Sequence, residues 1–258
     1  MPDSASPDVP ANVQSARTLF DVLECVKKGR GLTVSEVSAE LEYARSTVHR
    51  HLRTLEDLGY LVHRDDGYHL GLRFLDLGMN ARDTYAGYDL IRQKVAEIAE
   101  TTGERCQFFV EEHNDAVYLT RSVGDNAVQT DPGIGSRIPL YAASAGKAIL
   151  AELPESRLSD YIEQTEFEQL TNKTITDPDL LRAELAEIRE RGYSFNHQET
   201  LCGTHAVGVA VTDSDGRPIG GLSVTGPSHR LKGELFESDL PDLLLGAANE
   251  LELNIAFS

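Results

Sequence analysis

The sequence predicts an α+β protein, with a small helical domain followed by a larger domain of strands and helices. Between residues 13 and 58, apolar residues recur at the three- and four-residue spacing of buried helix faces. Between residues 107 and 225, apolar-rich runs bounded by polar turns predict antiparallel strands with helices between them. With 258 residues, the chain has room for two domains of ordinary size.

The N-terminal domain begins with two predicted helices. The first spans residues 13–26, and its apolar side chains at helical spacing are Ala16, Leu19, Phe20, Leu23 and Val26. The second starts where Thr33 and Glu36 have the S/T-x-x-E spacing of a capping box. A third helix follows a tight turn and ends before Gly59, a residue type that favours a helix end.

The third helix has two different faces. At about 100° per residue, its side chains divide into an apolar stripe of Val48, Leu52 and Leu55 and an opposite stripe of Ser46, Arg50 and Arg53, with His49 on the flank. An apolar stripe packs a helix on its partners, whereas guanidinium, imidazole and hydroxyl donors suit base edges and phosphates in a DNA major groove. The pattern therefore predicts a recognition helix.

A short hairpin is predicted directly after this helix. Residues 60–62 and 68–70 are apolar-rich, and the polar residues 63–67 form the tip between them. Three helices followed by a hairpin indicate a winged helix-turn-helix. The alternative is a surface helix whose arginines are merely solvated. The candidate DNA-binding residues are Arg45, Ser46, Thr47, His49, Arg50, Arg53 and Arg64.

The formal charge of −18 is unevenly distributed along the chain. Residues 12–78 hold nine Lys and Arg against ten Asp and Glu, whereas residues 79–258 hold fifteen against thirty. The excess of acid therefore lies away from the predicted DNA-binding face. So acidic a chain, with few Lys and no Trp, favours a cytosol of very high salt, where hydrated carboxylates keep the surface soluble. An ordinary acidic protein is the alternative.

Cysteine and histidine usage gives no metal or catalytic site. Cys25, Cys106 and Cys202 are odd in number and widely spaced, so the sequence predicts neither a disulfide framework nor a CxxC zinc site. His197, Cys202 and His205 lie close together, but no fourth zinc ligand has suitable spacing and no carboxylate is placed to orient a nucleophile. We therefore expect no metal, no cofactor and no catalytic residue.

No membrane partner is expected. Nothing approaches eighteen consecutive apolar residues, and no charged-then-apolar signal opens the chain. The sequence therefore predicts a soluble, cytoplasmic protein. The first residues are rich in Pro, Ser and Asp and predict a disordered tail.

Beyond the hairpin, the pattern predicts a linker and then a sensor domain. An amphipathic segment starts at Leu72 and passes Gly78, and a helix follows over residues 88–101. Strands are expected at 107–112, 116–121, 205–212 and 218–225, and helices at 142–153, 179–191 and 235–254. The predicted divisions are a tail over 1–11, a winged helix-turn-helix over 12–71, linker helices that form a dimer seam over 72–101, and a sensor domain over 102–258.

The chain resembles the IclR family of transcription regulators over nearly its whole length. The resemblance rests on the winged helix, on the run IPLYAASAGKAILA at 138–151 and on the run RGYSFNHQETLCGTHAVGVAVTDSDGRPIGGLSVTGP at 191–227. It implies a homodimer, possibly a tetramer, that binds an inverted-repeat operator in double-stranded DNA. It also implies a GAF-like effector-binding domain and control of catabolic genes by a small metabolite.

A candidate effector site combines this resemblance with physical chemistry. Ser144, Ala145 and Gly146 start a predicted helix, where free backbone N–H groups and the positive helix end suit a carboxylate. The resemblance implies a role for Ser144 and Ala145 and for positions later in the chain, although Asn196 replaces the usual acidic residue and Ala206 the usual Cys. Ser223 and Thr225 alternate along one strand face. The candidate effector-binding residues are Ser144, Ala145, Asn196, Thr204, Ala206, Ser223 and Thr225.

We therefore interpret the chain as a DNA-binding transcription regulator, not an enzyme, that responds to a small carboxylate such as a sugar acid or oxo-acid. Because only His205 adds any positive charge to the candidate site, a phosphorylated metabolite is disfavoured. A phosphate-binding loop is rejected, since Tyr141 and Ala148 stand where such a loop needs Gly and Ser or Thr. Lys147 is expected to support its helix. The alternatives are a ligand-independent regulator and a metabolite-binding or enzymatic domain with a vestigial winged helix.

Overall fold

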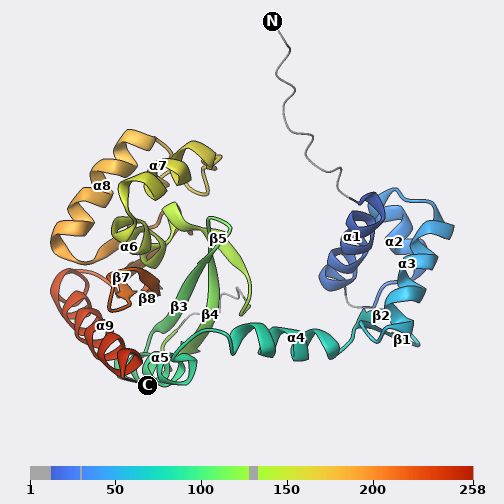
Figure 1. Ribbon diagram of the computed structural model, residues 1–258, viewed down its shortest axis with the longest axis horizontal. Coiled ribbons are helices and arrows are strands. Elements are labelled where there is room, and N and C mark those ends of the chain that lie inside the picture. Colours follow the sequence, from blue (N-terminus) through green and yellow to red (C-terminus); the bar gives the residue numbers. More distant parts are fainter. Residues whose placement is uncertain (1–12, 30, 128–132, 258) are drawn as a thin grey trace, which may run out of the picture. The chain divides into compact units, whose positions relative to one another are not determined.

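A computed structural model describes residues 13–29, 31–127 and 133–257 of the chain (Figure 1). It divides into two compact units, Met1–Ala81 and Arg82–Ser258, each with its own hydrophobic core. The tail expected over residues 1–11 lies outside the described residues.

The first unit is a winged helix-turn-helix. It consists of α1 (Gln14–Lys28), α2 (Val34–Leu41), α3 (Arg45–Asp57) and the antiparallel hairpin β1 (Leu61–Arg64) and β2 (Gly67–Leu70). The predicted capping box is confirmed: Thr33 N donates to Glu36 Oε2 at 2.8 Å, and Glu36 N donates to Thr33 Oγ1 at 3.3 Å. The predicted apolar stripe of α3 is buried with Val22, Val26 and Val37 in one core. Phe20 differs from the expected pattern, because its side chain is exposed on α1.

Helix α4 (Arg73–Arg82) follows the hairpin and buries none of its residues within the chain. Its apolar side chains are nevertheless numerous, and the exposed ones on or beside it are Leu72, Leu75, Leu77 and Met79. Helix α5 (Tyr88–Thr102) behaves differently, because its face of Ile91, Val95 and Ile98 is buried in the core of the second unit. The second half of the expected 72–101 linker therefore belongs to the core of the second unit.

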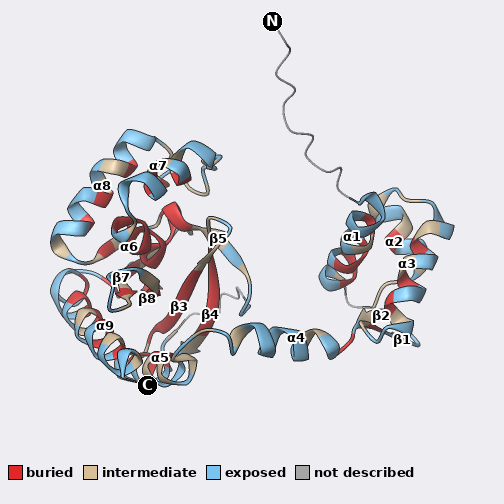
Figure 2. Cartoon of the chain, viewed as in Figure 1, coloured by how far each residue is buried: buried red, intermediate tan, exposed pale blue. Residues whose placement is uncertain are grey.

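The second unit is built on a six-stranded antiparallel sheet in the order β5-β4-β3-β8-β7-β6. The strands are β3 (Arg105–Glu112), β4 (Asp115–Val123), β5 (Arg137–Pro139), β6 (Ser194–His197), β7 (Thr204–Thr212) and β8 (Pro218–Pro227). The four strands expected from the sequence are confirmed, and β5 and β6 are additions at the two edges. Figure 2 shows that the central strands are buried, as expected for a sheet covered on both faces.

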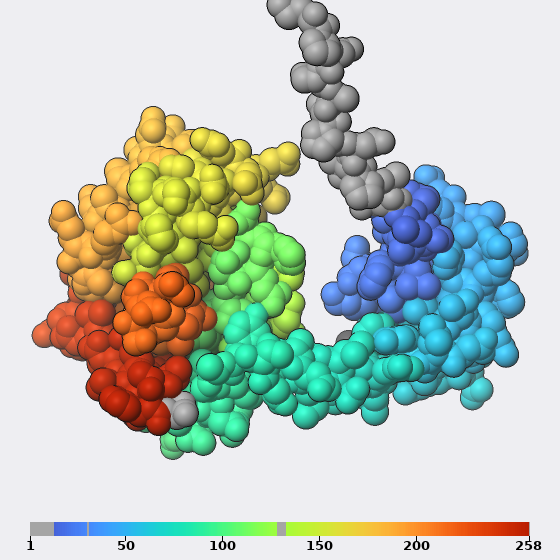
Figure 3. Space-filling view, in the orientation of Figure 1, coloured from blue at the N-terminus to red at the C-terminus, as the bar shows by residue number. Residues whose placement is uncertain are grey.

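Helices cover both faces of this sheet. One face packs on α5, on the short π-helix η2 (Leu235–Asp239) and on α9 (Leu240–Ala256), in a core that includes Phe108, Leu222 and Leu244. The other face packs on η1 (Leu140–Ala142), α6 (Ser144–Glu152), α7 (Glu155–Gln164) and α8 (Pro178–Arg191). In the space-filling view, α7 and α8 (yellow to orange) and α9 (red) form separate parts of the outer surface of this unit (Figure 3).

Helix α6 lies directly on the sheet because two strand residues lack side chains. A β-carbon on Gly208 would lie 2.3 Å from the Ala145 backbone nitrogen, and one on Gly221 would lie 2.9 Å from the Ala145 carbonyl oxygen. Glycine at these positions lets the first turn of α6 approach β7 and β8 closely. This approach places Ser144 beside the polar residues of the sheet.

Across the described ranges, no helix combines the length and the apolar character needed to cross a membrane.

Candidate DNA-binding surface and ligand cavity

Most of the predicted recognition residues are exposed on one helix of the first unit, α3. On α3, Arg45, Ser46, His49, Arg50 and Arg53 are exposed and Thr47 is half-buried; Arg64 is exposed at the end of β1. Ser46, Arg50 and Arg53 lie opposite the buried stripe of Val48, Leu52 and Leu55, with His49 on the flank. The surface therefore presents hydroxyl, imidazole and guanidinium donors, the groups that read base edges and hold phosphates.

The two outward arginines of α3 differ in their surroundings. Arg53 forms ion pairs within its own helix, with Nη1 3.5 Å from Glu56 Oε2 and Nε 3.3 Å from Asp57 Oδ1. Among the described residues, none forms a hydrogen bond or ion pair with the Arg50 guanidinium. Arg50 is therefore the better placed of the two to donate to a base, since exposed ion pairs such as those of Arg53 are weak but still compete.

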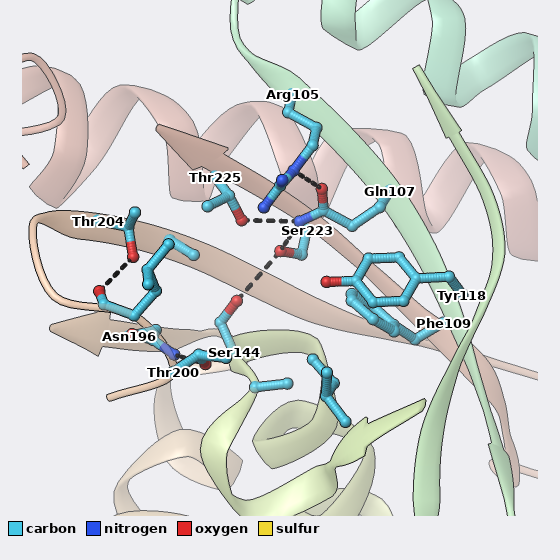
Figure 4. Close-up of a pocket in the computed structure, with 14 residues that line it drawn as sticks. Arg105, Gln107, Phe109, Tyr118, Ser144, Asn196, Thr200, Thr204, Ser223 and Thr225 are labelled. Atoms are coloured by element: carbon cyan, nitrogen blue, oxygen red, sulfur yellow. Dashed lines mark hydrogen bonds between the residues drawn. The ribbon is translucent and has the colours of Figure 1, made fainter. Parts of the chain in front are cut away.

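A cavity of about 150 Å³ lies in the second unit, between the sheet and the start of α6 (Figure 4). Six of the seven residues expected at the effector line it: Ser144, Asn196, Thr204, Ala206, Ser223 and Thr225. Further lining residues that the sequence analysis did not identify are Arg105, Gln107, Phe109, Tyr118, Ile138, Ala143, Thr200 and Leu201.

Strand register explains why residues distant in the sequence meet at this cavity. Arg105 of β3 pairs with Thr225 of β8, which pairs in turn with Ala206 of β7, and Ala206 pairs with Asn196 of β6. Side chains directly opposite each other on neighbouring strands project from the same face of a sheet. One row of residues across four strands therefore lines the cavity.

Gln107 connects the polar groups at one end of the cavity. Its Oε1 accepts a hydrogen bond from Arg105 Nε at 3.1 Å. Its Nε2 donates to Ser223 Oγ at 2.8 Å and to Thr225 Oγ1 at 2.7 Å. Ser223 Oγ also lies 3.1 Å from Ser144 Oγ, so the chain of hydrogen bonds reaches from Arg105 to the first residue of α6 (Figure 4).

Aromatic rings form another wall of the cavity. The rings of Phe109 and Tyr118 lie 4.2 Å apart between centroids, and the Tyr118 hydroxyl points toward the cavity (Figure 4). Burial raises the pKa of Tyr118, an effect that the positive charge of Arg105 opposes. Tyr118 is therefore a neutral phenol that can accept or donate a hydrogen bond.

Asn196 lines the cavity but is already bonded to the protein. Its Nδ2 donates to the Ala142 carbonyl at 2.6 Å and to Thr200 Oγ1 at 2.9 Å, and its Oδ1 accepts from Glu199 N at 2.9 Å. These bonds join β6 to η1 and to the turn after β6. The contacts of Asn196 therefore show that it holds this turn in place.

Ala145, which we also expected at the effector, does not line the cavity. It is completely buried against Gly208 and Gly221 of the sheet, and Ala143, just before the helix, lines the cavity instead. The sequence correctly placed a helix start here, but the side that faces the sheet depends on tertiary packing.

The expectation that the site lacks a formal positive charge, apart from His205, is wrong. Arg105 lines the cavity, whereas His205 lies in a separate cluster, with its Nδ1 2.8 Å from the Leu231 carbonyl oxygen and its ring stacked on Phe236. Arg105 and Gln107 stand at alternate positions of one strand. Their alternate positions place both side chains on one face of β3, but only the pairing of β3 with β8 shows that this face lines the cavity.

Lys147 supports its helix, as expected. Its Nζ lies 2.7 Å from Glu199 Oε1, and both side chains are buried. Within the described parts of the chain, no three His, Cys, Asp or Glu residues gather in a way that could hold a metal ion.

These features define a helix-turn-helix transcription regulator with a second, α+β domain. Residues 15–65 match the IclR helix-turn-helix domain, and residues 88–252 match the domain described as bacterial transcriptional regulator IclR C-terminal. The chain therefore belongs to the IclR family of transcriptional regulators, and it is a regulator rather than an enzyme.

The similarity to individual relatives extends over most or nearly all of the chain. The chain is 30% identical to the probable HTH-type transcriptional regulator ArcR of Halobacterium salinarum, over 98% of both chains. It is 29% identical to the HTH-type transcriptional regulator KdgR of Escherichia coli, over 88% of both. The crystal structure of the Thermotoga maritima IclR superposes with a TM-score of 0.81 at 27% identity, over 94% of this chain and 98% of that one.

Proposed function

We propose that this regulator binds operator DNA through α3 and the wing and releases or tightens that binding when a small carboxylate occupies the cavity of the second unit. The observation that carries the proposal is the pairing, in one chain, of an exposed donor-rich helix with a cavity that has polar groups at one end. The proposed DNA contacts are the seven predicted residues, with Arg50 reading a base and Arg53 nearer a phosphate.

The proposed operator is an inverted repeat bound by a homodimer, or by a tetramer made of two dimers. One recognition helix reads only a few base pairs, so symmetric regulators place two such helices on half-sites spaced by helical turns. The exposed apolar residues of α4, from Leu72 to Met79, support this assignment because they have no partner within their own chain's core. We propose that this part of the expected linker forms the dimer seam.

The proposed effector is a small carboxylate, of the sugar-acid or oxo-acid classes that the sequence suggested. A volume of about 150 Å³ is that of a cavity known to hold a benzene-sized molecule, which supports a compact metabolite. The positive charge of Arg105 supports an anion. Genes for the catabolism of such an acid are the proposed targets, and the cytoplasm, where chromosomal DNA lies, is the proposed location.

We also propose that the protein works in concentrated salt. The thirty acidic residues of residues 79–258 support this habitat. In molar salt the Debye length is about 3 Å, so counterion release adds little to DNA affinity and base contacts must supply most of it. The nearly balanced charge of residues 12–78 is consistent with DNA affinity that comes mainly from base contacts rather than from counterion release.

Footprinting on the DNA upstream of the neighbouring genes tests the proposal. In molar potassium chloride we expect two protected half-sites of related, inverted sequence separated by whole helical turns. A single protected site without symmetry would contradict the dimeric operator. Protection that fails to appear on any upstream DNA would contradict the assignment of α3.

A further inference from the structure

The end of helix α3 is bound by the first residue of helix α4. Leu58 is the C-terminal cap of α3, and Gly59 after it has a φ of +77°. The last carbonyl groups of a helix have no partner within it, and they form the negative end of the helix dipole. Arg73 Nη1 donates to the Leu58 carbonyl oxygen at 2.5 Å. A guanidinium suits this position, since it supplies both a donor and a positive charge.

An aromatic contact joins the same two segments. The guanidinium carbon of Arg73 lies 4.9 Å from the centre of the Tyr60 ring, and the centre of the Phe74 ring lies 5.0 Å from it. Tyr60 N donates to the Leu55 carbonyl at 2.8 Å, so the turn that ends α3 holds Tyr60 in place. Tyr60 and Phe74 both pack on the hydrophobic core of the first unit. The first turn of α4 is therefore packed on the turn that ends α3.

The two residues between β2 and α4 are held by backbone hydrogen bonds. Gly71 N donates to the Tyr60 carbonyl at 2.7 Å, and the Leu72 carbonyl accepts from Leu75 N at 2.9 Å. Gly71 is buried, and a β-carbon on it would lie 2.6 Å from the Gly59 carbonyl oxygen. Glycine therefore allows the backbone that leads into α4 to lie directly against the end of α3.

The direction of α4 matters because this helix carries the proposed dimer seam from Leu72 to Met79. In a symmetric dimer, such a seam fixes the two copies of α4 relative to each other. If each α4 is fixed to its own α3, the distance and the angle between the two copies of α3 are fixed as well. The half-sites of the operator must then match that distance and that angle.

We infer that Arg73 is a positioning residue that, together with Gly71 and the contact between Tyr60 and Phe74, joins α3 and α4 into one rigid body and so determines the half-site spacing that the dimer accepts. The inference rests on the proposed function, because it needs a dimer that reads an inverted repeat. It adds to that function a determinant of specificity that acts through the angle between two helices and not through a base contact.

Fluorescence anisotropy with the full-length protein and three labelled duplexes tests this inference. The first duplex carries the footprinted operator, the second carries the same half-sites with two base pairs inserted between them, and the third carries one half-site. Two added base pairs move a half-site by about 7 Å and rotate it by about 70° around the DNA axis. We expect wild-type affinity for the respaced duplex to fall at least about 100-fold, because a rigid dimer can no longer engage both half-sites.

Variants at Arg73 separate positioning from DNA contact. Arg73→Ala removes the bond to the Leu58 carbonyl and the contact with the Tyr60 ring. We expect it to reduce the penalty for the inserted base pairs at least about 10-fold and to leave affinity for one half-site unchanged, since the outward face of α3 is untouched. Arg73→Lys can still donate to the carbonyl and should restore most of the spacing selectivity. Arg92→Ala, at an exposed arginine paired with Asp89, is the matched control and should behave as wild type.

Gly71→Ala tests the joint at a second position. Its methyl group would meet the Gly59 carbonyl oxygen, so the start of α4 must shift away from the end of α3. We expect this variant also to lose selectivity for the wild-type spacing while it keeps its affinity for one half-site. The melting temperature of each variant shows whether it folds, and the exposed position of Arg73 keeps the test informative if Gly71→Ala does not.

The outcomes distinguish this inference from the function on which it rests. Full spacing selectivity in Arg73→Ala, or a loss of affinity for one half-site as large as that for the whole operator, would overturn the positioning role and leave the dimeric operator in place. Equal wild-type affinity for the two spacings would overturn the rigid joint. Wild-type protein that binds two half-sites no more tightly than one would contradict the dimeric operator itself.

Discussion

The ammonium of Lys147 lies 2.7 Å from one carboxylate oxygen of Glu199, and the other oxygen, Oε2, is buried with no hydrogen-bond partner among the described residues. Lys147 belongs to α6, whose first residue lines the cavity, and Glu199 directly precedes the lining residues Thr200 and Leu201. The Glu199 carbonyl accepts from Thr174 Oγ1 at 2.7 Å. The pair therefore fixes one wall of the cavity to the helix that begins at it.

Replacing Lys147 by Met should destabilise the second unit by about 3–5 kcal/mol at neutral pH, because it leaves a buried carboxylate without its counter-charge. Lys173→Met, at an exposed lysine, is the control and should change stability little. Urea denaturation measures both. The double variant Lys147→Met, Glu199→Leu should recover much of the loss, and a double variant as unstable as the single one would contradict this account of the pair.

The cost of Lys147→Met should also depend on pH. Burial raises the pKa of Glu199 and Lys147 opposes that rise, so removing Lys147 raises the pKa further. A carboxyl whose pKa is higher in the folded state stabilises the fold at low pH and loses that contribution as the pH rises through its folded-state value. The difference between wild type and Lys147→Met should therefore shrink from about pH 7.5 to pH 5; a constant difference would argue against a buried charge.

His197 should make the second unit sensitive to mild acid. Partial desolvation lowers the pKa of His197, whose ring remains in part exposed, and the nearby His205 lowers it further, so the folded state favours the neutral ring. The stability that this provides is present above the unfolded-state value of about 6.5 and is lost as the pH falls through the folded-state value. Melting temperatures between about pH 7.5 and pH 5.5 should fall less for His197→Gln than for wild type. His229→Gln, at an exposed histidine, is the control. If the melting temperature fell equally with pH in wild type, His197→Gln and His229→Gln, the proposed effect of His197 would be ruled out.

Arg50→Ala should weaken operator binding by about 1–3 kcal/mol, if its guanidinium binds a guanine in the major groove. Arg53→Ala should weaken specific and non-specific DNA alike, since a phosphate contact carries no sequence information. Arg92→Ala, on α5 of the other unit, should leave both affinities unchanged. Fluorescence anisotropy with operator and scrambled duplexes separates these cases. Full operator affinity in the folded Arg50→Ala, Arg53→Ala variant would remove α3 as the recognition helix.

Charge placed on α4 should separate the proposed dimer. Leu72→Glu with Leu75→Glu introduces repulsion into a seam whose two leucines are 83% and 59% exposed in the single chain. We expect a monomer by sedimentation in molar potassium chloride and operator affinity reduced to that of one half-site. A dimer that survives the double substitution would place the seam elsewhere.

The sequence analysis succeeded where signals are local. The capping box at Thr33 and the Val48, Leu52 and Leu55 stripe each lie within one helix, so spacing alone predicts their structure. Strand residues Ser223 and Thr225 were identified from the resemblance to the IclR family, and their alternate positions place both on one face of the strand.

Arg105 and Tyr118 could not be found in that way. Their presence at the cavity depends on β3 lying between β8 and β4, a pairing that brings together residues more than a hundred positions apart, such as Arg105 and Thr225. Ala145 shows the converse, since it begins the correct helix but faces Gly208 rather than the cavity. The side of a helix or strand that faces a site depends on strand order and on close packing between elements. A single stretch of sequence predicts neither of these.

Operator affinity measured with and without a bound acid tests the central claim most directly. Wild-type protein and Ala206→Leu, whose larger side chain fills the cavity from β7, are titrated with labelled operator in the absence and presence of saturating benzoate. We predict that benzoate changes the wild-type affinity at least about fivefold, the lower range of allosteric coupling, and leaves that of Ala206→Leu unchanged. Equal operator affinities with and without a ligand that calorimetry shows to be bound would contradict the claim that the cavity controls DNA binding.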